Sequence, residues 1–305
     1  MAPPSGYPTD AIRGTAERSV PVVGGVQLPR ENVYGHLKRL HWIRDRLRPT
    51  DRAIEFGCGT GFMLTLPLRV WGYDVRGVDL DERSIAGGRE IMAAAGQPRD
   101  ALQAIDLRDL DGSLDAVIAS EVLEHLEDTT LAGALAAIHE RLRHDGALLV
   151  TVPNGYGWFE LEALLWNRTP LGRLFRLGVV RGLAYRLRRR LAGAYVDAAH
   201  PSTLADSPHV RRFTLRSLCE TLESAGFAVE LTRGSVMFCG PFTHALLTGV
   251  APFMRWNARL GDRFPTLAAG FYVAARRVPR GSASHQLIST STESTPRSRN
   301  VAGRP

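Results

Sequence analysis

Lysine and cysteine are both scarce in this sequence of 305 residues. Its 38 Lys and Arg residues include one lysine, Lys38, and its three cysteines form no CxxC pair. This argues against a zinc knuckle or a disulfide framework and fits a reducing compartment. No run of about 20 apolar residues is present, so we expect no transmembrane helix. Residues 1–25 lack the continuous apolar core of a signal peptide, and we therefore expect a cytoplasmic protein.

Basic residues are in excess, with a formal net charge of +7. Such an excess can indicate a nucleic-acid partner. Here the basic residues are almost all arginine in a chain rich in Ala, Gly and Pro, so we give weight only to local clusters. The densest cluster is 168–190, where eight arginines are interleaved with leucines.

The most informative stretch is 53–61, AIEFGCGTG. An apolar run with one acid leads into three glycines spaced two apart. This pattern predicts a buried strand followed by a tight turn into a helix. Glycine allows a positive φ and the close approach of a ligand. We expect the amides of the turn and the start of the helix to face that ligand.

Strands and helices alternate from this stretch onward. The expected strands are 52–57, 74–78, 101–105, 114–119, 147–152, 227–231 and 271–275, and the expected helices are 31–47, 61–71, 83–95, 129–143 and one between Thr214 and Gly226. The alternation predicts a doubly wound α/β fold with a seven-stranded, mostly parallel sheet.

We expect one large domain at 29–277. It would follow a flexible segment, 1–28, and precede a disordered tail, 278–305, that is rich in Ser, Thr, Arg and Pro. Two segments interrupt the alternation, namely the arginine-rich 155–212 and the apolar 237–266. We expect both to form a helical lid over a substrate cleft.

Acidic side chains stand where the predicted strands end. Asp79 and Asp106 end the second and third strands, and Glu121 follows the fourth. In a parallel sheet these ends meet at one edge, where ligands bind. Asp79 lies at the distance beyond Gly57 at which a carboxylate can accept ribose hydroxyls. The GxGxG spacing does not fit the GxGxxG pattern of NAD dehydrogenases.

These motifs, in this order, resemble the class I S-adenosylmethionine-dependent methyltransferases. The residues that carry the resemblance are 55–61, Asp79, Asp106, 115–125, the Asp145-Gly146 turn and Pro153-Asn154. The match spans about 31–154 and resumes at 209–231. It implies a Rossmann-like methyltransferase fold and S-adenosylmethionine as cofactor.

Two features also resemble the O-methyltransferases of ubiquinone biosynthesis. They are the run Glu121-Val122-Leu123-Glu124-His125 and the segment 209–213 before the last large helix. The length of 155–200 and the insertion at 237–266 depart from that family.

The superfamily resemblance implies a set of cofactor-binding residues. They are Glu55, Gly57, Cys58, Gly59 and Gly61 from the first turn, and Asp79, Leu80, Asp106, Leu107, Glu121 and Val122 from the later strand ends. Glu55 and the turn amides would hold the methionine end, Asp79 the ribose and Asp106 the adenine. The alternatives are an ordinary turn for the glycines, a helix N-cap for Asp79, a loop acid for Asp106 and a packing role for Cys58.

Methyl transfer to a hydroxyl needs an aligned acceptor and a base or a metal. The catalytic candidates are Glu124, His125 and His209, with His200 as a further histidine to consider. On one helical face Glu121, Glu124 and His125 could also hold a divalent cation such as Mg²⁺. The alternative is that Glu121 contacts cofactor while Glu124 and His125 support the substrate wall.

The acceptor is the least determined part. Because 237–266 is apolar, we expect O-methylation of an apolar or lipid-linked small molecule, which could be quinone-like, a polyketide or a glycolipid. For 168–190 three interpretations stay open: a solvated lid, a peripheral contact with the inner face of a membrane, and RNA binding. RNA ranks lowest because only Phe175 and Tyr185 are aromatic there. The alternatives are an RNA or polysaccharide methyltransferase and a non-catalytic cofactor-binding or membrane-surface protein.

Overall fold

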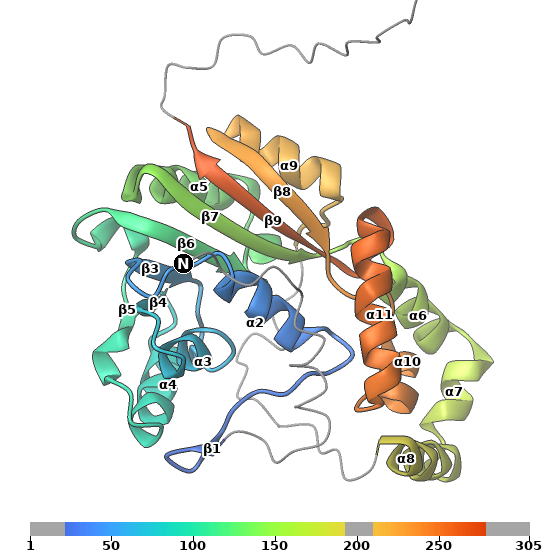
Figure 1. The fold of residues 1–305 in the computed structure, drawn as a ribbon. Helices are drawn as coiled ribbons and strands as arrows, with labels where there is room; N and C mark the ends of the chain where they lie inside the picture. Colours follow the sequence, from blue (N-terminus) through green and yellow to red (C-terminus); the bar gives the residue numbers. More distant parts are fainter. Residues whose placement is uncertain (1–21, 193–209, 279–305) are drawn as a thin grey trace, which may run out of the picture.

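A seven-stranded sheet forms the centre of the computed structural model, which describes residues 22–192 and 210–278 (Figure 1). The strands are β3 (Ala53–Phe56), β4 (Val75–Asp79), β5 (Leu102–Ala104), β6 (Leu114–Ser120), β7 (Leu142–Pro153), β8 (Phe227–Gly234) and β9 (Gly270–Arg277). Their order is β5-β4-β3-β6-β7-β9-β8. The pairs from β5 to β7 are parallel, and β9 runs antiparallel to both β7 and β8. The predicted doubly wound, mostly parallel sheet is confirmed.

Alternation along the strands divides the core into two layers. On one face Val117 and Val150 pack against α5 (Asp128–Arg141) and α9 (Leu215–Ser224). On the other, Ile118 and Leu149 pack against α2 (His36–Arg44) and α3 (Thr65–Val70). Successive residues of a strand point to opposite faces, so two adjacent apolar residues serve two layers. A third cluster lies under α4 (Glu82–Ala94).

The helix starts differ from the sequence prediction for local reasons. The helix expected at 31–47 begins at His36, because Gly35 takes a left-handed conformation and the Glu31 carboxylate accepts the amides of Asn32 and Lys38. The helix expected from Gly61 begins at Thr65. The glycine turn is thus longer than predicted.

The segment expected to be flexible at 1–28 is ordered in its described part. β1 (Val22–Val23) and β2 (Val26–Gln27) pair as a small antiparallel hairpin. Leu28 is buried, and the two valines Val23 and Val26 pack with it against the cluster under α4. That expectation is therefore wrong for 22–28. The tail expected at 278–305 lies outside the described residues except for Val278, which donates an amide to Gly226 O.

The two insertions form a group of helices beside the sheet. The first contributes α6 (Trp158–Arg168), α7 (Pro170–Arg176) and α8 (Gly178–Ala192). The second contributes α10 (Pro241–Leu247), α11 (Ala251–Arg263) and the short η5 (Pro265–Leu267). We call α6, α7, α8 and α10 the helical arm. Figure 1 shows the arm extending away from the sheet on the side of α11.

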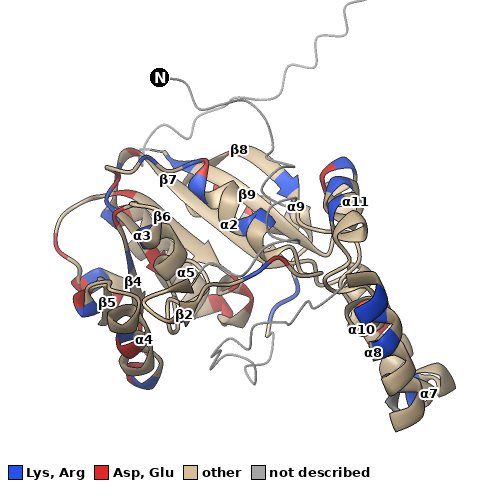
Figure 2. Cartoon of the chain, turned by 60° about the horizontal axis from the view of Figure 1, so that its bottom comes forward, with Lys and Arg blue, Asp and Glu red and all other residues tan. Residues whose placement is uncertain are grey.

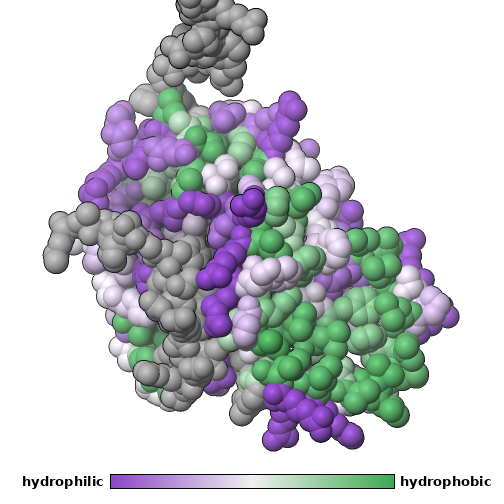
Figure 3. All heavy atoms as spheres, turned by 45° about the vertical axis from the view of Figure 1, so that its right-hand side comes forward, coloured by the Kyte–Doolittle hydropathy of each residue, from purple (hydrophilic) through white to green (hydrophobic). Residues whose placement is uncertain are grey.

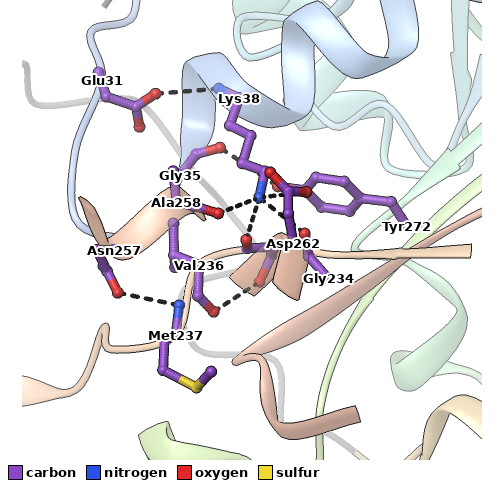
Figure 4. A network of polar contacts seen from close by, with 11 residues as sticks. Glu31, Gly35, Lys38, Gly234, Val236, Met237, Asn257, Ala258, Asp262 and Tyr272 are labelled. Atoms are coloured by element: carbon purple, nitrogen blue, oxygen red, sulfur yellow. Dashed lines mark hydrogen bonds and ion pairs between the residues drawn. The ribbon is translucent and has the colours of Figure 1, made fainter. Parts of the chain in front are cut away.

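Lys38, the one lysine of the sequence, joins α2 to the end of β8 and to α11 (Figure 4). Lys38 is 2% exposed, and its ammonium donates to Gly234 O, Ser235 O and Ala258 O at 3.0, 2.5 and 2.8 Å. It also pairs with Asp262 Oδ1 at 3.0 Å. Burial lowers the pKa of Lys38, and the Asp262 carboxylate opposes that shift. This contact ties α2 to the end of β8 and to α11, so it fixes where the second insertion leaves the sheet.

Candidate cofactor and active site

A cavity of about 460 Å³ opens at the carboxyl ends of β3, β4 and β5. Its lining residues are Phe56, Gly57, Val78, Asp79, Leu80, Ile105, Asp106, Leu107, Arg108, Val122, His125, Leu126, Thr129, Thr130, Gly133, Ala134 and Ala137. Six of the predicted cofactor residues are among them, together with one predicted catalytic residue, His125. The sheet edge predicted as the ligand site therefore does carry a cavity.

Glycine is required at two positions of the turn. Gly57 has φ +69°, and a Cβ there would collide with Val122 on the cavity wall. Gly61 has φ +65°, and a Cβ would lie 2.7 Å from Leu102 Cδ2. A side chain at either position would be strained by both the backbone and the neighbouring packing. The turn therefore keeps Val122 against the cavity and α3 against the sheet.

The amides of this turn donate within the protein. Gly57 N and Cys58 N donate to Val78 O at 2.9 and 3.1 Å, and Gly59 N donates to Asp79 Oδ2 at 2.7 Å. These amides therefore already have acceptors within the protein, whereas the sequence predicted that they would face the ligand. Cys58 is buried, and burial raises the pKa of its thiol, which matches the packing role.

Glu55 lies behind the turn and does not line the cavity. Its Oε2 accepts Thr65 N at 2.9 Å and Thr65 Oγ1 at 2.5 Å. Burial raises the pKa of Glu55 to about 7, and these hydrogen bonds oppose the shift. In this structure Glu55 positions the start of α3, while its predicted contact with the methionine end stays a prediction.

Two carboxylates reach the cavity from neighbouring strands. Asp79 accepts Gly59 N and, at 2.9 Å, Asp81 N, which aims its carboxylate across the end of β4. Asp106 caps η2 (Leu107–Asp109) and pairs with Arg108 at 2.7 Å, which lowers the pKa of Asp106. Asp106 is therefore ionised at neutral pH, and both carboxylates can accept hydrogen bonds at the cavity.

The wall opposite these carboxylates comes from α5, which sequence reasoning did not assign to the site. Gly133 and Ala134 lie three and four positions after Thr130, and Ala137 lies four and three positions after them, so the four residues share one helix face. The leucines of the same helix, Leu131 and Leu135, pack into the core instead. A run of small residues beside an apolar stripe was the available signal for this wall.

The segment after β6 does not form the helical face that would bring the predicted metal ligands together. Glu121 has φ +55°, and residues Leu123–His125 form the short 3₁₀ turn η3. Glu121 is held outward, with Thr151 Oγ1 donating to its Oε1 at 3.0 Å and Arg39 Nη1 pairing at 3.3 Å. In the described part of the chain no group of three His, Cys, Asp or Glu side chains is placed to hold a metal ion. The expected ligand set of Glu121, Glu124 and His125 is therefore not formed.

Glu124 is the most deeply buried acid near the site. It is 1% exposed, and its Oε2 has no hydrogen-bond partner. Burial, and then the nearby charge of Glu121, raise the pKa of Glu124 to about 9. Its carboxyl group is consequently protonated at neutral pH. It lies 3.8 Å from His125 Nε2, which lines the cavity.

Arg39 and Thr151 are site residues that sequence reasoning missed. Arg39 comes from α2, which lies far from Glu121 in sequence, and Thr151 comes from β7. Only the packing of α2 on the sheet brings this arginine to the edge. Two further candidates, His200 and His209, lie outside the described residues.

The cavity suits an adenosine-type ligand. Its volume is in the range of small-ligand pockets. Leu80, Ile105, Leu107 and Leu126 give it apolar sides, and Asp79 places a carboxylate on its wall. A planar base can pack on such sides while ribose hydroxyls donate to the carboxylate. The residues present therefore fit S-adenosylmethionine.

Comparison with known proteins agrees with this geometry. A family model described as "Methyltransferase domain" matches residues 30–232. A Mycolicibacterium smegmatis protein named "Probable S-adenosylmethionine-dependent methyltransferase" is 31% identical over 238 residues, which cover 77% of this chain and 72% of that protein.

Two shorter matches carry lipid names. "Sphingolipid C9-methyltransferase A" of Emericella nidulans is 26% identical over 40% of this chain, and "Probable fatty acid methyltransferase" of Pseudomonas putida is 28% identical over 39%. These matches cover 24% and 30% of the relatives, so the chain spans only about a quarter of the sphingolipid enzyme. The long matches, the parallel sheet and the cavity at its edge lead to one conclusion: the chain belongs to the S-adenosylmethionine-dependent methyltransferases.

Proposed function

We propose that the protein transfers a methyl group from S-adenosylmethionine to an oxygen atom of an apolar or lipid-linked small molecule. The observation that carries this proposal is the cavity that Asp79 and His125 both line. The ribose-binding candidate and a proton-accepting candidate therefore share one space.

The bound cofactor would supply an activated methyl group, so the chain has to align the acceptor and manage one proton. We propose His125 as the group that accepts the proton from an acceptor hydroxyl. Glu124, whose pKa burial raises to about 9, lies 3.8 Å from that imidazole and supports the wall beside the ring without a hydrogen bond to it. His209 stays a candidate for a second base.

The lipid class of the acceptor has two supports. The arm exposes many large apolar side chains, and two relatives bear the names of sphingolipid and fatty acid enzymes. We propose that acceptors are met at a membrane surface through 168–190. No helix in the described ranges is long and apolar enough to cross a membrane.

Carbon is a second candidate acceptor atom, because one relative is named for methylation at C9. Mild base separates the two outcomes when the product is an ester, since a methyl ester is hydrolysed and a C-methyl group is retained. Mass analysis of the labelled product covers ethers as well.

Two measurements test the proposal. Binding of S-adenosylhomocysteine by calorimetry should be weakened about 10- to 100-fold in Asp79→Ala and retained in His125→Ala. Incubation of lipid extracts with methyl-labelled cofactor should label an organic-soluble product, and His125→Ala should reduce that labelling by on the order of 100-fold, the usual contribution of a general base. Full cofactor binding without labelling of any lipid fraction would refute the acceptor class.

A further inference from the structure

The helical arm has a small core of its own. Trp166, Phe175 and Phe242 meet as a ring cluster, with ring centroids 5.0 to 6.0 Å apart. Glu162 Oε2 and Oε1 accept Thr243 N at 2.9 Å and Thr243 Oγ1 at 2.5 Å. These contacts join α6 and α7 from the first insertion to α10 from the second. The helices of the arm are thus packed into one unit, so the same side chains always form its outer surface.

That outer surface is strongly apolar. On α8, Val179, Leu183, Leu187 and Leu191 recur every four residues, and Val179 and Leu183 are 85% and 64% exposed. Residues at this spacing lie along one side of a helix. Further exposed leucines on α6 and α7 are Leu161, Leu164, Leu171 and Leu174. Figure 3 shows the resulting apolar area (green) with strongly hydrophilic residues (purple) along its lower border.

On α7 and α8 the charge beside this surface has one sign, while Glu160 lies next to the α6 leucines and is 3.9 Å from Arg212. Residues 163–192 contain eight arginines and no Asp or Glu. Arg186 and Arg190 each follow a stripe leucine, Leu183 and Leu187, by three positions, so they flank the stripe. Figure 2 shows basic positions (blue) along α8. A helix with an exposed apolar stripe and flanking arginines has the composition of one that lies in a membrane interface.

We propose that the helical arm docks on the surface of an anionic phospholipid bilayer, with the α8 stripe in the acyl boundary and Arg186, Arg189 and Arg190 at the headgroups. A second copy of the chain is disfavoured as occupant, because it would set eight arginines against eight with no acid between them. RNA would leave the leucine stripe in water. Anionic lipid satisfies both the apolar and the basic part.

This inference deepens the proposed function, on which it rests for its biological purpose. The first insertion leaves the sheet at Asn154, directly after β7. Asn154 Nδ2 donates to Thr266 O at 3.2 Å and to Ala268 O at 2.9 Å, and so fixes the start of the first insertion to the end of the second. Docking would hold the carboxyl edge of the sheet, and its cavity, at a set position relative to lipid acceptors.

The test is flotation of the full chain with vesicles of phosphatidylcholine, with and without an equal share of phosphatidylglycerol. The wild-type chain should bind the anionic vesicles and scarcely bind the neutral ones. The triple variant Arg186→Gln/Arg189→Gln/Arg190→Gln should weaken binding on the order of 100-fold, because one basic residue contributes a factor of about five at such a surface. Leu183→Gln/Leu187→Gln should also release the protein.

The matched control is Arg76→Gln/Arg83→Gln/Arg216→Gln, which removes the same charge from exposed positions of the sheet domain. It should keep most of the binding. Equal loss in both triple variants would overturn the inference, as would equal binding to neutral vesicles. Self-association abolished by the leucine variant, or RNA binding that vesicles fail to displace, would overturn it in favour of another occupant. If the protein binds S-adenosylhomocysteine but not vesicles, only the proposed docking of the arm is refuted. If it binds vesicles but methylates no lipid, only the proposed function is refuted.

Discussion

Leucine has opposite environments in the sheet domain and in the helical arm. Leu131, Leu135 and Leu148 are buried between the sheet and its helices, whereas Leu171, Leu183 and Leu187 are 48% to 64% exposed. The patterns of the two regions are alike in sequence, since both place leucine at helical spacing. What differs is whether a sheet face lies opposite. The comparison teaches that periodicity predicts an apolar helix face and says nothing of what covers it.

The sheet domain and the helical arm also differ in how their charged residues are paired. In the sheet domain, arginines pair with carboxylates, as in Arg143–Asp115 at 2.5 Å and Arg276–Glu230 at 2.7 Å. The arm has no acid between residues 163 and 192. The sheet domain thus pairs its arginines internally, while the arginines of 163–192 have no acid beside them in that segment, which is the charge that the proposed anionic surface would neutralise. The predictions below test whether the regions are as independent as this contrast implies.

The largest expected effect is at the Lys38 contact, which joins α2 to the end of β8 and to α11. Lys38→Ala should lower the free energy of unfolding by about 3–5 kcal/mol, because it leaves three buried carbonyl groups and the half-buried Asp262 carboxylate without their cation. Urea denaturation followed by circular dichroism measures this. Arg216→Ala, at an exposed arginine of α9, is the control and should change stability by less than about 0.5 kcal/mol. Similar changes in the free energy of unfolding for the two variants would mean that the Lys38 contact stabilises the fold no more than an exposed arginine does.

A pH effect should come from the sheet domain. Glu55 has a folded pKa of about 7 against an ordinary 4.5, so the folded state binds the proton more tightly. Its contribution to stability is present below pH 4.5 and is lost as the pH rises to 7, by up to roughly 3 kcal/mol. Urea midpoints for wild type and Glu55→Gln across pH 4.5–8 should diverge over that window. Parallel curves would show that Glu55 keeps its ordinary pKa.

Cofactor affinity should depend on the sheet edge and not on the arm. Asp79→Ala should weaken S-adenosylhomocysteine binding by about 10- to 100-fold, the contribution of hydrogen bonds to a charged group. Leu183→Gln, in the arm, should leave that affinity unchanged. Calorimetry distinguishes the two, and an equal loss in both would mean that the arm contributes to the cavity.

Two glycines of one turn offer a smaller, matched comparison. Gly57→Ala should destabilise the chain by about 2–3 kcal/mol, because its φ is positive and the new methyl meets Val122. Gly59→Ala should cost about 1–2 kcal/mol, since its φ is also positive but its Cβ points into open space. Thermal melts of both variants measure the difference, which should vanish if Val122 can move aside.

The smallest effect is expected within the arm. Thr243→Val removes the hydroxyl that donates to Glu162 and should cost about 1–2 kcal/mol locally. Hydrogen exchange should then rise in α6 and α10 and stay unchanged in β6. Thr221→Val, which alters an intrahelical hydroxyl bond of α9, is the control and should leave exchange in the arm unaltered.

Local signals in the sequence were sufficient for the sheet and for part of the cavity. The strand ends at Gly57, Asp79 and Asp106 follow from apolar runs that stop at glycine or acid, and the cavity lies there. The helix expected between Thr214 and Gly226 is present as α9, and the Thr214 hydroxyl caps it by accepting Ser217 N at 3.1 Å.

Non-local geometry decided what the sequence could not supply. Arg39 reaches Glu121 only because α2 packs across the sheet, and the left-handed φ of Glu121 interrupts a pattern that resembles a helix start. The predicted lid is a related case. No described residue of the arm lines the cavity, because the first insertion leads outward from Asn154. Its role as a lid stays a prediction.

Because Lys38 is the one lysine of the sequence, its chemical labelling can report how often the structure opens around it. Lys38 is the one lysine side chain that an amine-reactive reagent can modify in this sequence. Its ammonium group is in contact with four oxygen atoms, which close it off from the reagent. Covalent labelling at Lys38 can therefore proceed only when α2 separates from α11. Mass spectrometry of a single peptide would then give the frequency of that separation, in solution or on vesicles, without any engineered probe.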